Sequence, residues 1–247
     1  MEILEKKLIL AKEIVEAIEF KHAAIIMDGN RRWAKERHLP SALGHKEGVK
    51  ALKKTLRAAD SLGVKYLTVY AFSTENWNRT PDEVKFLMDL LANTLMNELD
   101  EMHENNVIIS FIGDVTQLSD SLQVILQKAV EKTKNNTGVA LQIAFNYGSR
   151  AEILRACKSV AERVASGKVS VDEITENMFS EALYTSNIPD PDILIRTGGE
   201  MRISNYLLWQ IAYSEIYVTD IFWPEFDVDA LCDAIIEFGR RNRRWGK

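Results

Sequence analysis

The stretch AAIIMDGNRRWAKE, residues 23–36, decides the fold that we expect for this chain. Its first five residues, 23–27, are apolar, which predicts a buried strand of a parallel sheet. Asp28, Gly29 and Asn30 end the strand, and the polar residues after them have helical character. A strand that turns directly into a helix leaves free backbone N–H groups at the carboxyl end of a sheet. Such a position is suited to binding a phosphate group.

Asp28 is an acid at a point where a phosphate would be repelled, and Arg31 and Arg32 follow it closely. This combination indicates a divalent cation between acid and phosphate, and Mg²⁺ binds in this way through one or two carboxylates plus substrate phosphates. Asp is also a common N-cap of helices. For the tripeptide alone, capping and catalysis are equally good interpretations, and the rest of the chain has to decide between them.

Composition predicts one globular domain over residues 1–247, since 46% of the residues are hydrophobic and 27% are charged. We see no linker rich in Pro, Gly or Ser and no internal repeat. The formal net charge of −5 argues against a general nucleic-acid-binding protein. Cys157 and Cys232 lack metal-ligand spacing, which predicts core thiols of a reduced protein. With no membrane-spanning run and no signal-peptide pattern, we expect a cytoplasmic location.

Hydrophobic periodicity predicts alternating helices and strands, the pattern of a parallel sheet. Residues 1–20 form an amphipathic helix, which we expect to dock on the domain because its polar face has as many acids as lysines. Thr80, Pro81 and Glu83 predict the start of a helix that continues to residue 105. The expected strands are 23–27, 64–72, 107–112, 139–145, 193–195 and 216–218, and the other expected helices are 45–63, 122–130, 149–164, a short one from 170, and 229–247 with its basic tail. Capping boxes at Ser149 with Glu152 and at Ser170 with Glu173 are expected to open two of these helices. The fold class is α/β, with a single doubly wound, mostly parallel sheet of about six strands flanked by helices.

Polar clusters follow the predicted strands one after another. They are Asp28, the run 73–79, Gly113 with Asp114, the run 146–148 and the run 196–200. The carboxyl ends of parallel strands share one edge, and open α/β folds bind ligands there. Five arginines, at positions 31, 32, 79, 196 and 202, can neutralise two diphosphates at this edge. Each arginine taken singly is equally well explained by an ordinary surface ion pair.

Familiar phosphate-binding motifs are missing from the sequence. It contains no GxxxxGK[ST] loop, and no GxGxxG follows the first strand. A phosphatase with a carboxylate nucleophile would have a second acid near Asp28, where Asn30 stands instead. The paired DDxxD clusters of helical trans-prenyl synthases are also missing.

Several long motifs resemble the cis-prenyltransferase family in the correct order and over nearly the whole chain. They are HAAIIMDGNRRWAK from His22, GHKEG from Gly44, YAFSTENWNR from Tyr70, FNYGSR from Phe145, the run from IRTGGE at Ile195 to WPEF at Phe226, and RRWG from Arg243. The resemblance implies a Mg²⁺-dependent homodimer that condenses isopentenyl diphosphate repeatedly, with Z stereochemistry, onto an allylic diphosphate, expected to be farnesyl diphosphate. The implied product is a long polyprenyl diphosphate such as undecaprenyl diphosphate, the lipid carrier for cell-wall glycan synthesis. The product is delivered to the membrane, which leaves open a transient membrane contact of the enzyme.

The resemblance also implies roles for individual residues. Asp28 is expected to hold Mg²⁺ on a diphosphate, and Glu215 matches a second metal-site acid of the family. The residues expected to bind the allylic diphosphate are Gly29, Asn30, Arg31 and Arg32, with Trp33 and His45 beside it. Those expected on the isopentenyl side are Arg196, Arg202, Ile203 and Ser204. The mobile segment of the family corresponds to Ser73, Thr74, Glu75, Asn76, Trp77 and Arg79, and the C-terminal motif that reaches the partner subunit corresponds to Arg244 and Gly246.

The family assigns Asn76 the role of proton acceptor, but a neutral amide is a very poor base. A diphosphate oxygen is a better final acceptor. The chain departs from the family pattern at three positions: Arg31 replaces a glycine, Ser41 an arginine and Met201 a histidine. The first departure also occurs elsewhere in the family. The second weakens the first diphosphate site, and the third weakens the case for a metal at Glu215.

An apolar tunnel for the growing chain is expected between the sheet and the helix that starts at Pro81, because each buried methylene contributes about 0.8 kcal/mol. The Leu- and Met-rich stripe of that helix is equally explained by core packing. Two other functions compete with the synthase. A non-catalytic partner subunit would be expected to lack Asp28 or the RTGGE run, and a phosphohydrolase would use Asp28 as its nucleophile.

Overall fold

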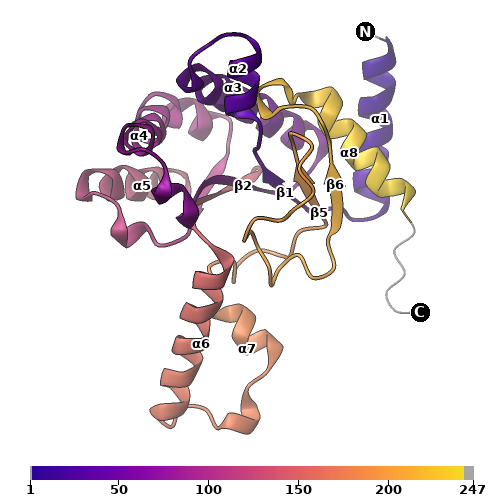
Figure 1. Cartoon of the computed structure of the whole chain (residues 1–247). Helices are drawn as coiled ribbons and strands as arrows, with labels where there is room; N and C mark the ends of the chain where they lie inside the picture. The colour runs from indigo at the N-terminus through magenta and orange to yellow at the C-terminus, as the bar shows by residue number, and fades with distance from the viewer. Residues whose placement is uncertain (1, 242–247) are drawn as a thin grey trace.

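A six-stranded sheet, parallel throughout, forms the centre of the computed structural model, which describes residues 2–241 (Figure 1). Its strands are β1 (His22–Ile26), β2 (Tyr66–Ser73), β3 (Ile108–Ile112), β4 (Ala140–Tyr147), β5 (Ile193–Arg196) and β6 (Glu215–Val218). They lie in the order β3-β4-β2-β1-β5-β6. The predicted strands are confirmed, with ends that shift by one or two residues.

Eight α-helices connect and flank the strands in the described part of the chain. They are α1 (Glu2–Ala17), α2 (Asn30–Glu36), α3 (Ser41–Leu62), α4 (Pro81–Glu104), α5 (Asp120–Thr133), α6 (Ser149–Ala165), α7 (Glu176–Glu181) and α8 (Val228–Arg240). Short 3-10 turns are η1 (Thr74–Asn78), η2 (Val115–Gln117), η3 (Val171–Glu173) and η4 (Trp223–Glu225). None of the helices within residues 2–241 combines the length and the apolar character needed to cross a bilayer.

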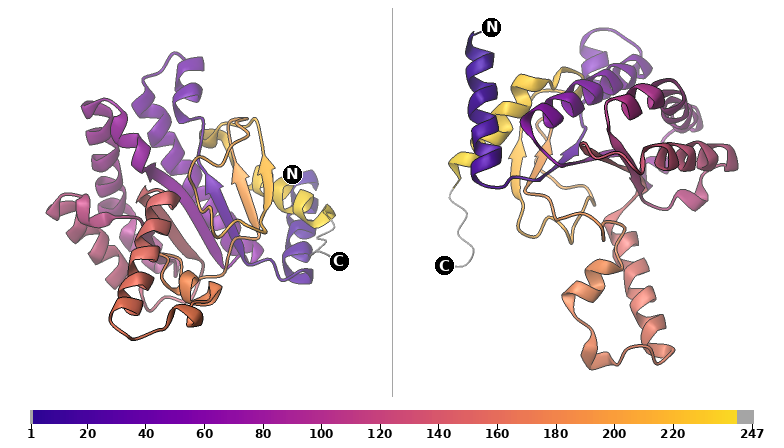
Figure 2. Two further views of the ribbon diagram at one scale, coloured as in Figure 1. Left: turned by 60° about the horizontal axis from the view of Figure 1, so that its bottom comes forward. Right: turned by 180° about the vertical axis from the view of Figure 1, so that it is seen from behind.

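The two faces of the sheet are covered differently. Alternate residues of β1, such as Ala23 and Ile25, belong to the larger core, which the helices α1, α3, α4, α5 and α8 complete. Ala24 and Ile26 face a smaller core, which residues 203–211 cover. The helices α6 and α7 project away from the sheet as an arm (Figure 2). The sheet is wound to both sides of β1, as predicted, but an irregular segment rather than a layer of helices covers its second face.

The arm also explains the position of a cysteine. Cys232 is buried in α8, as predicted, whereas Cys157 is exposed on α6. The apolar pattern around Cys157 predicted a core position. A helix that projects from the domain buries only a narrow stripe, so this prediction was wrong.

Helix starts were predicted with mixed success. The Thr80 side chain caps α4 by accepting a hydrogen bond from the backbone N–H of Glu83, as expected. Ser149 is already inside α6, and the Glu152 carboxylate turns away to accept hydrogen bonds from the Tyr147 hydroxyl and a distant backbone N–H. That capping box was wrong because a buried tertiary contact outweighs the local one.

The predictions for Ser170 and for the N-terminal helix were confirmed in part and in full, respectively. The capping box at Ser170 exists, but it opens the turn η3 and not a helix. The N-terminal helix α1 docks on the domain as predicted, with Lys7 paired to Asp229 and Asp233 of α8.

Strand β1 is the point at which the winding of the sheet changes direction. The chain proceeds from β1 to β2 on one side, whereas β5 pairs with β1 on the other side, with Ile26 opposite Arg196. Ligands of open α/β sheets bind at such a switch point, at the carboxyl ends of the strands. The loops after β1, β2, β4 and β5 all meet there.

Candidate active site

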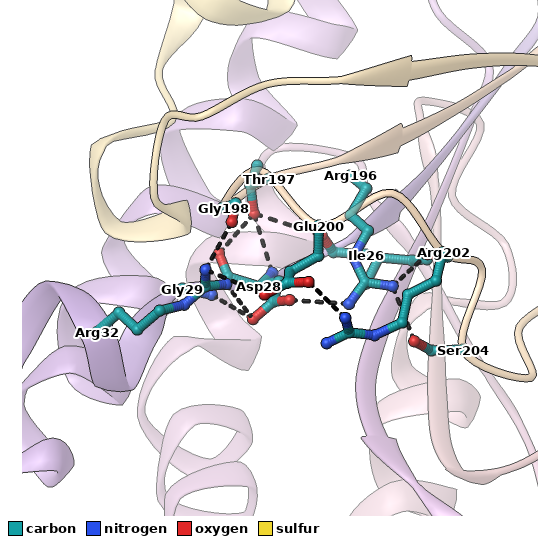
Figure 3. Close-up of polar contacts among 10 residues, drawn as sticks. All are labelled: Ile26, Asp28, Gly29, Arg32, Arg196, Thr197, Gly198, Glu200, Arg202 and Ser204. Atoms are coloured by element: carbon teal, nitrogen blue, oxygen red, sulfur yellow. Dashed lines mark hydrogen bonds and ion pairs between the residues drawn. The ribbon is translucent and has the colours of Figure 1, made fainter.

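Asp28, directly after β1, lies at the centre of a polar cluster (Figure 3). One carboxylate oxygen, Oδ2, accepts a hydrogen bond of 2.9 Å from Arg196. The other, Oδ1, accepts 2.7 Å from the backbone N–H of Gly29 and lies 3.1 Å from a guanidinium nitrogen of Arg32. Gly29 adopts φ 104°, a left-handed conformation that only glycine takes at low cost, and this turn brings its N–H to Asp28.

Arg196 at the end of β5 is almost fully buried, with 4% of its surface exposed. Besides Asp28, it donates to the Ser204 hydroxyl at 2.8 Å and to the backbone carbonyl of Arg202. Its planar fork therefore joins the strand end to the loop that follows it. Three of the residues predicted from the sequence for the isopentenyl side are held together by these bonds.

The remaining arginines surround the same opening. Arg32 donates to the Gly198 carbonyl at 2.7 Å and lies 3.5 Å from Glu200. Glu83, in the first turn of α4, lies 2.9 Å from Arg79 and 3.8 Å from Arg31. Each of these three arginines thus has an acidic or carbonyl partner within the protein.

The charges of the site shift the pKa of Asp28. Burial alone would raise this pKa, but the hydrogen bond and charge of Arg196, together with the charge of Arg32, outweigh burial and lower it. Asp28 is therefore an anion at neutral pH.

The pKa of His45 is lowered as well, but for an imidazole a lower pKa favours the uncharged form. Burial, together with the positive charges of Arg79 and Arg31, lowers its pKa to about 4, although the charge of Glu83 opposes the shift. The imidazole is therefore neutral at pH 7.

Several buried polar atoms at the site lack a hydrogen-bond partner. They are the Asn30 Oδ1, the His45 Nε2, the Arg196 Nε and, beside them, the Trp33 Nε1. Buried polar groups are almost always paired, so unpaired ones at a cavity indicate positions that a ligand completes. The first three belong to residues that line the cavity described next.

A cavity of about 1170 Å³ opens at this edge of the sheet. The predicted residues that line it are Asp28, Gly29, Asn30, Arg31, Arg32, His45, Ser73, Glu75, Asn76, Arg79, Arg196, Arg202 and Ser204. Trp33, Thr74, Trp77 and Ile203 are not part of its wall. Apolar residues, among them Ile26, Ala71 and Leu87, contribute to the wall as well.

Asn76 occupies the cavity wall, but its amide is already engaged. Its Oδ1 accepts a hydrogen bond of 3.1 Å from the backbone N–H of Ser73, and together these residues form a capping box around η1. An oxygen that caps the turn is less available to a proton, which agrees with the poor basicity of an amide. The catalytic role of Asn76 stays a prediction.

Glu215 does not lie near Asp28. It begins β6 and so stands at the amino edge of the sheet, opposite Ile193 in register, whereas Asp28 follows the carboxyl end of β1. Its carboxylate lies 3.0 Å from the Arg241 guanidinium. A metal role for Glu215 stays a prediction, and the predicted residues Arg244 and Gly246 lie outside the described residues.

Three further residues belong to the site although the sequence reasoning did not select them. The Thr197 hydroxyl accepts from the backbone N–H of Asp28 at 2.9 Å and donates to its carbonyl at 2.7 Å, which fixes the Asp28 backbone. Asn205 donates to Glu75 at 2.8 Å, and Tyr70 lines the cavity. Thr197 directly follows Arg196, and Asn205 directly follows Ser204. This adjacency to predicted site residues was the signal in the sequence that could have identified them.

The side chains around Asp28 determine which kind of metal site can form there. Among the described residues, no group of three or more His, Cys, Asp or Glu side chains is placed to hold a metal ion. A single carboxylate beside arginines fits Mg²⁺ that is bound mainly through substrate phosphates. It does not fit a site built from protein ligands alone.

The fold and the cavity define an α/β protein with an anionic-ligand site at the switch point of a parallel sheet. Residues 26–246 match the family model described as "Putative undecaprenyl diphosphate synthase". The chain belongs to this family of prenyltransferases.

Two curated relatives agree with this assignment. The isoprenyl transferase of Clostridium perfringens is 53% identical, over 92% of this chain and 89% of its own length. The ditrans,polycis-undecaprenyl-diphosphate synthase of Micrococcus luteus, named as specific for (2E,6E)-farnesyl diphosphate, is 51% identical over 92% of this chain and 91% of its own length. These names support a prenyl transferase.

Solved structures share the fold. Lavandulyl diphosphate synthase from Lavandula x intermedia, in complex with dimethylallyl diphosphate, superposes with a TM-score of 0.89 at 36% identity, over 92% of this chain and 98% of the other. A probable undecaprenyl diphosphate synthase from Campylobacter jejuni gives a TM-score of 0.77 at 34% identity, over 92% and 99%.

Proposed function

We propose that this protein elongates prenyl chains with Z stereochemistry, by condensing isopentenyl diphosphate repeatedly with an allylic diphosphate in the presence of Mg²⁺. Farnesyl diphosphate is the proposed primer, and a long polyprenyl diphosphate such as undecaprenyl diphosphate, the lipid carrier for cell-wall glycan synthesis, is the proposed product. The observation that carries this proposal is the single cavity that gathers Asp28, the arginines and Ser204.

The allylic diphosphate is placed on the α2 side of the cavity. Asn30 and His45 support this placement, because each presents a buried unpaired atom there. Their neighbours Arg31 and Arg32 supply charge-assisted hydrogen bonds, each contributing about 1.5–3 kcal/mol. Because the His45 imidazole is neutral, it contributes a hydrogen bond without adding a further charge.

Isopentenyl diphosphate is placed against Arg196, Arg202 and Ser204. The buried Arg196 fork is oriented in advance by its bonds to Asp28 and Ser204, so little entropy is lost when an anion arrives. Since Asp28 lies between this arginine and Arg32, both diphosphates meet at one carboxylate. The acid is thus adjacent to the bond that breaks.

Asp28 is the residue that would hold Mg²⁺ on a diphosphate, and the ion, when bound, supplies charge stabilisation of the departing diphosphate. The arginines around it neutralise the same developing charge. As the allylic C–O bond breaks, a C–C bond forms to the isopentenyl unit. The proton that this unit then loses passes to an oxygen of the released diphosphate, because Asn76, the acceptor that the family resemblance suggests, is a neutral amide and a very poor base.

The apolar part of the cavity wall protects the allylic cation from water. We place the growing chain between the sheet and α4, where Leu87 already lines the cavity. The proposed assembly is a homodimer in which Arg244 and Gly246 reach the partner's site. The proposed location is the cytoplasm, with membrane contact when the product leaves.

The decisive experiment incubates the protein with farnesyl diphosphate, radiolabelled isopentenyl diphosphate and Mg²⁺ and sizes the products. We expect a ladder that ends in a long polyprenyl diphosphate. Release of phosphate from simple phosphate esters, without any need for isopentenyl diphosphate, would favour a phosphohydrolase with Asp28 as its nucleophile. No reaction under either condition would indicate a non-catalytic subunit.

A further inference from the structure

The segment that ends β2 and forms η1 presents two different sides. Ser73, Glu75, Asn76 and Arg79 line the cavity. Trp77, in the middle of the same segment, is not part of the cavity wall, and 42% of its surface is exposed. Its indole ring packs edge-on against Phe72, with ring centroids 5.3 Å apart. Trp77 therefore points away from the proposed substrates, although it sits among residues that face them.

The indole N–H of Trp77 has one specific partner. It donates to the Asn146 Oδ1 at 2.8 Å. Asn146 lies near the end of β4, with 2% of its surface exposed, and its Nδ2 donates to the backbone carbonyl of Asp114 at 2.7 Å. An indole can only donate and a carbonyl can only accept, so these two partners fix the orientation of the amide between them.

The backbone at Asn146 is also unusual. Its φ is 48°, in the left-handed region, where Asn is one of the few residues other than Gly that occur readily. Its backbone carbonyl accepts a hydrogen bond of 3.1 Å from the N–H of Asp114. Both the backbone and the side chain of Asn146 are therefore bonded to Asp114, in the loop after β3. Asn146 is therefore a rigid point to which the more exposed Trp77 is attached.

We propose that Asn146 is a positioning residue that acts through the Trp77 indole to hold the cavity-facing side chains of segment 73–79 against the substrates. Neither Asn146 nor Trp77 touches the ligands in this proposal. The proposed function is assumed only for the kinetic part of the argument. A second attachment of the same segment, from Glu75 to Asn205, lies on the cavity side and cannot orient the opposite side of the turn.

The test uses Asn146→Gly, Trp77→Phe and the double variant in the full-length protein. Gly accepts the left-handed backbone and removes the amide with the rest of the side chain, and Phe keeps an aromatic ring against Phe72 and removes the N–H donor. Asn136→Ala is the matched control, because its Nδ2 also donates to a backbone carbonyl, that of Val107, at the far end of β3.

Two measurements are made on each variant. The first is acrylamide quenching of the Trp77 emission. This emission is the difference between two spectra of the same Asn146 background, one with Trp77 and one with Trp77→Phe. Here we expect Asn146→Gly to increase quenching about twofold. The second is steady-state kinetics, where each single variant lowers kcat/KM about tenfold, the size expected for one lost hydrogen bond, and the double variant lowers it no further. Asn136→Ala changes neither quantity.

The proposal is overturned if Asn146→Gly leaves Trp77 quenching at the wild-type level, or if the two single effects multiply in the double variant. Trp77→Phe alters an exposed side chain, and if Asn146→Gly fails to fold, an unchanged kcat/KM for Trp77→Phe overturns the proposal. Should the wild-type protein show no condensation, the proposed function fails. The quenching measurement then still decides whether Asn146 holds Trp77.

Discussion

The Asp28 carboxylate and the Arg196 guanidinium form an ion pair of 2.9 Å, although 168 positions separate them in the sequence. The pair exists because β1 and β5 are neighbours in the sheet, with Ile26 opposite Arg196 in register. The carboxylate and the guanidinium are thus placed by strand pairing, and each orients the other.

Replacing Asp28 by Asn keeps the shape of the side chain and removes its charge. We expect condensation to slow by about 100-fold or more, because charge stabilisation at the departing diphosphate is lost. Stability should fall by about 1–2 kcal/mol, since Arg196 loses its anionic partner. Radiolabel incorporation and urea unfolding measure the two effects. Glu225→Gln, which breaks the exposed pair with Arg37, is the control, and turnover of Asp28→Asn within twofold of wild type would refute the role.

Arg196→Lys tests the geometry of the buried fork. Lysine keeps the charge but cannot bond Asp28, Ser204 and the Arg202 carbonyl together. We expect KM for isopentenyl diphosphate to rise by about tenfold or more, with a smaller effect on the KM of the primer. Arg57→Lys, in an exposed pair with Glu101, should leave both constants unchanged. Equal effects on both substrates would contradict the assignment of Arg196 to the isopentenyl side.

Gly48→Ala tests how Asn30 is positioned. A Cβ at this residue of α3 would lie 2.5 Å from the Asn30 Oδ1 and 3.0 Å from the Trp223 ring. We expect a stability loss of about 1–3 kcal/mol and a raised KM for the allylic diphosphate, because Asn30 has to move. Gly167→Ala is the control for a stability loss that leaves Asn30 in place: its φ of 70° strains any residue with a Cβ, but no neighbouring atom lies within 4 Å, so its kinetics should be unchanged. An unchanged KM for Gly48→Ala would argue against a substrate contact of Asn30.

Stability should fall at acidic pH because of buried His22. Burial lowers its pKa to about 4, and its ring nitrogens lie 2.7 Å from the Pro189 carbonyl and from the Thr68 hydroxyl. The folded state therefore disfavours protonation, so this stabilisation is complete above the unfolded pKa of about 6.5 and is lost as the pH falls from there toward 4. The expected slope reaches about 1.4 kcal/mol per pH unit for this group.

Urea unfolding between pH 7 and pH 4.5 checks this prediction. His22→Gln removes one titrating group and should reduce the slope over this range, leaving the contribution of His45, whose pKa is lowered to about 4 as well. His103→Gln, at the exposed end of α4, should not change it. A wild-type stability that stays constant down to pH 4.5 would exclude the effect.

Product length should depend on the wall formed by α4. The sequence predicts that a bulky residue at Leu91 or Leu95 shortens the product. Leu95 has 2% of its surface exposed within the main core, so Trp at this position also overpacks the core by about 1–3 kcal/mol, whereas Leu91 is only partly buried. Leu91→Trp is the better variant. Met96→Trp, exposed on the same helix, is the control, and an unchanged product ladder for Leu91→Trp would place the chain elsewhere.

Local sequence patterns determined much of this protein. The apolar run before Asp28, the glycine after it and the Thr80 cap depend on residues within one helical turn or one strand, so their structure follows from propensity and hydrogen bonding alone. The alternation of strands and helices also implied that polar residues at strand ends meet at one edge. Arg196 and Asp28 meet there as expected.

Only the tertiary structure decided which side chains face the cavity. The Trp77 indole bonds to Asn146 and does not line the cavity. The Glu152 carboxylate bonds to Tyr147 and does not cap its helix. Glu215 lies at the amino end of its strand, away from Asp28. These outcomes depend on contacts between residues far apart in the sequence, where burial and strand register outweigh local preference. Sequence patterns contain the local preferences, but the contacts that override them exist only once the chain has folded.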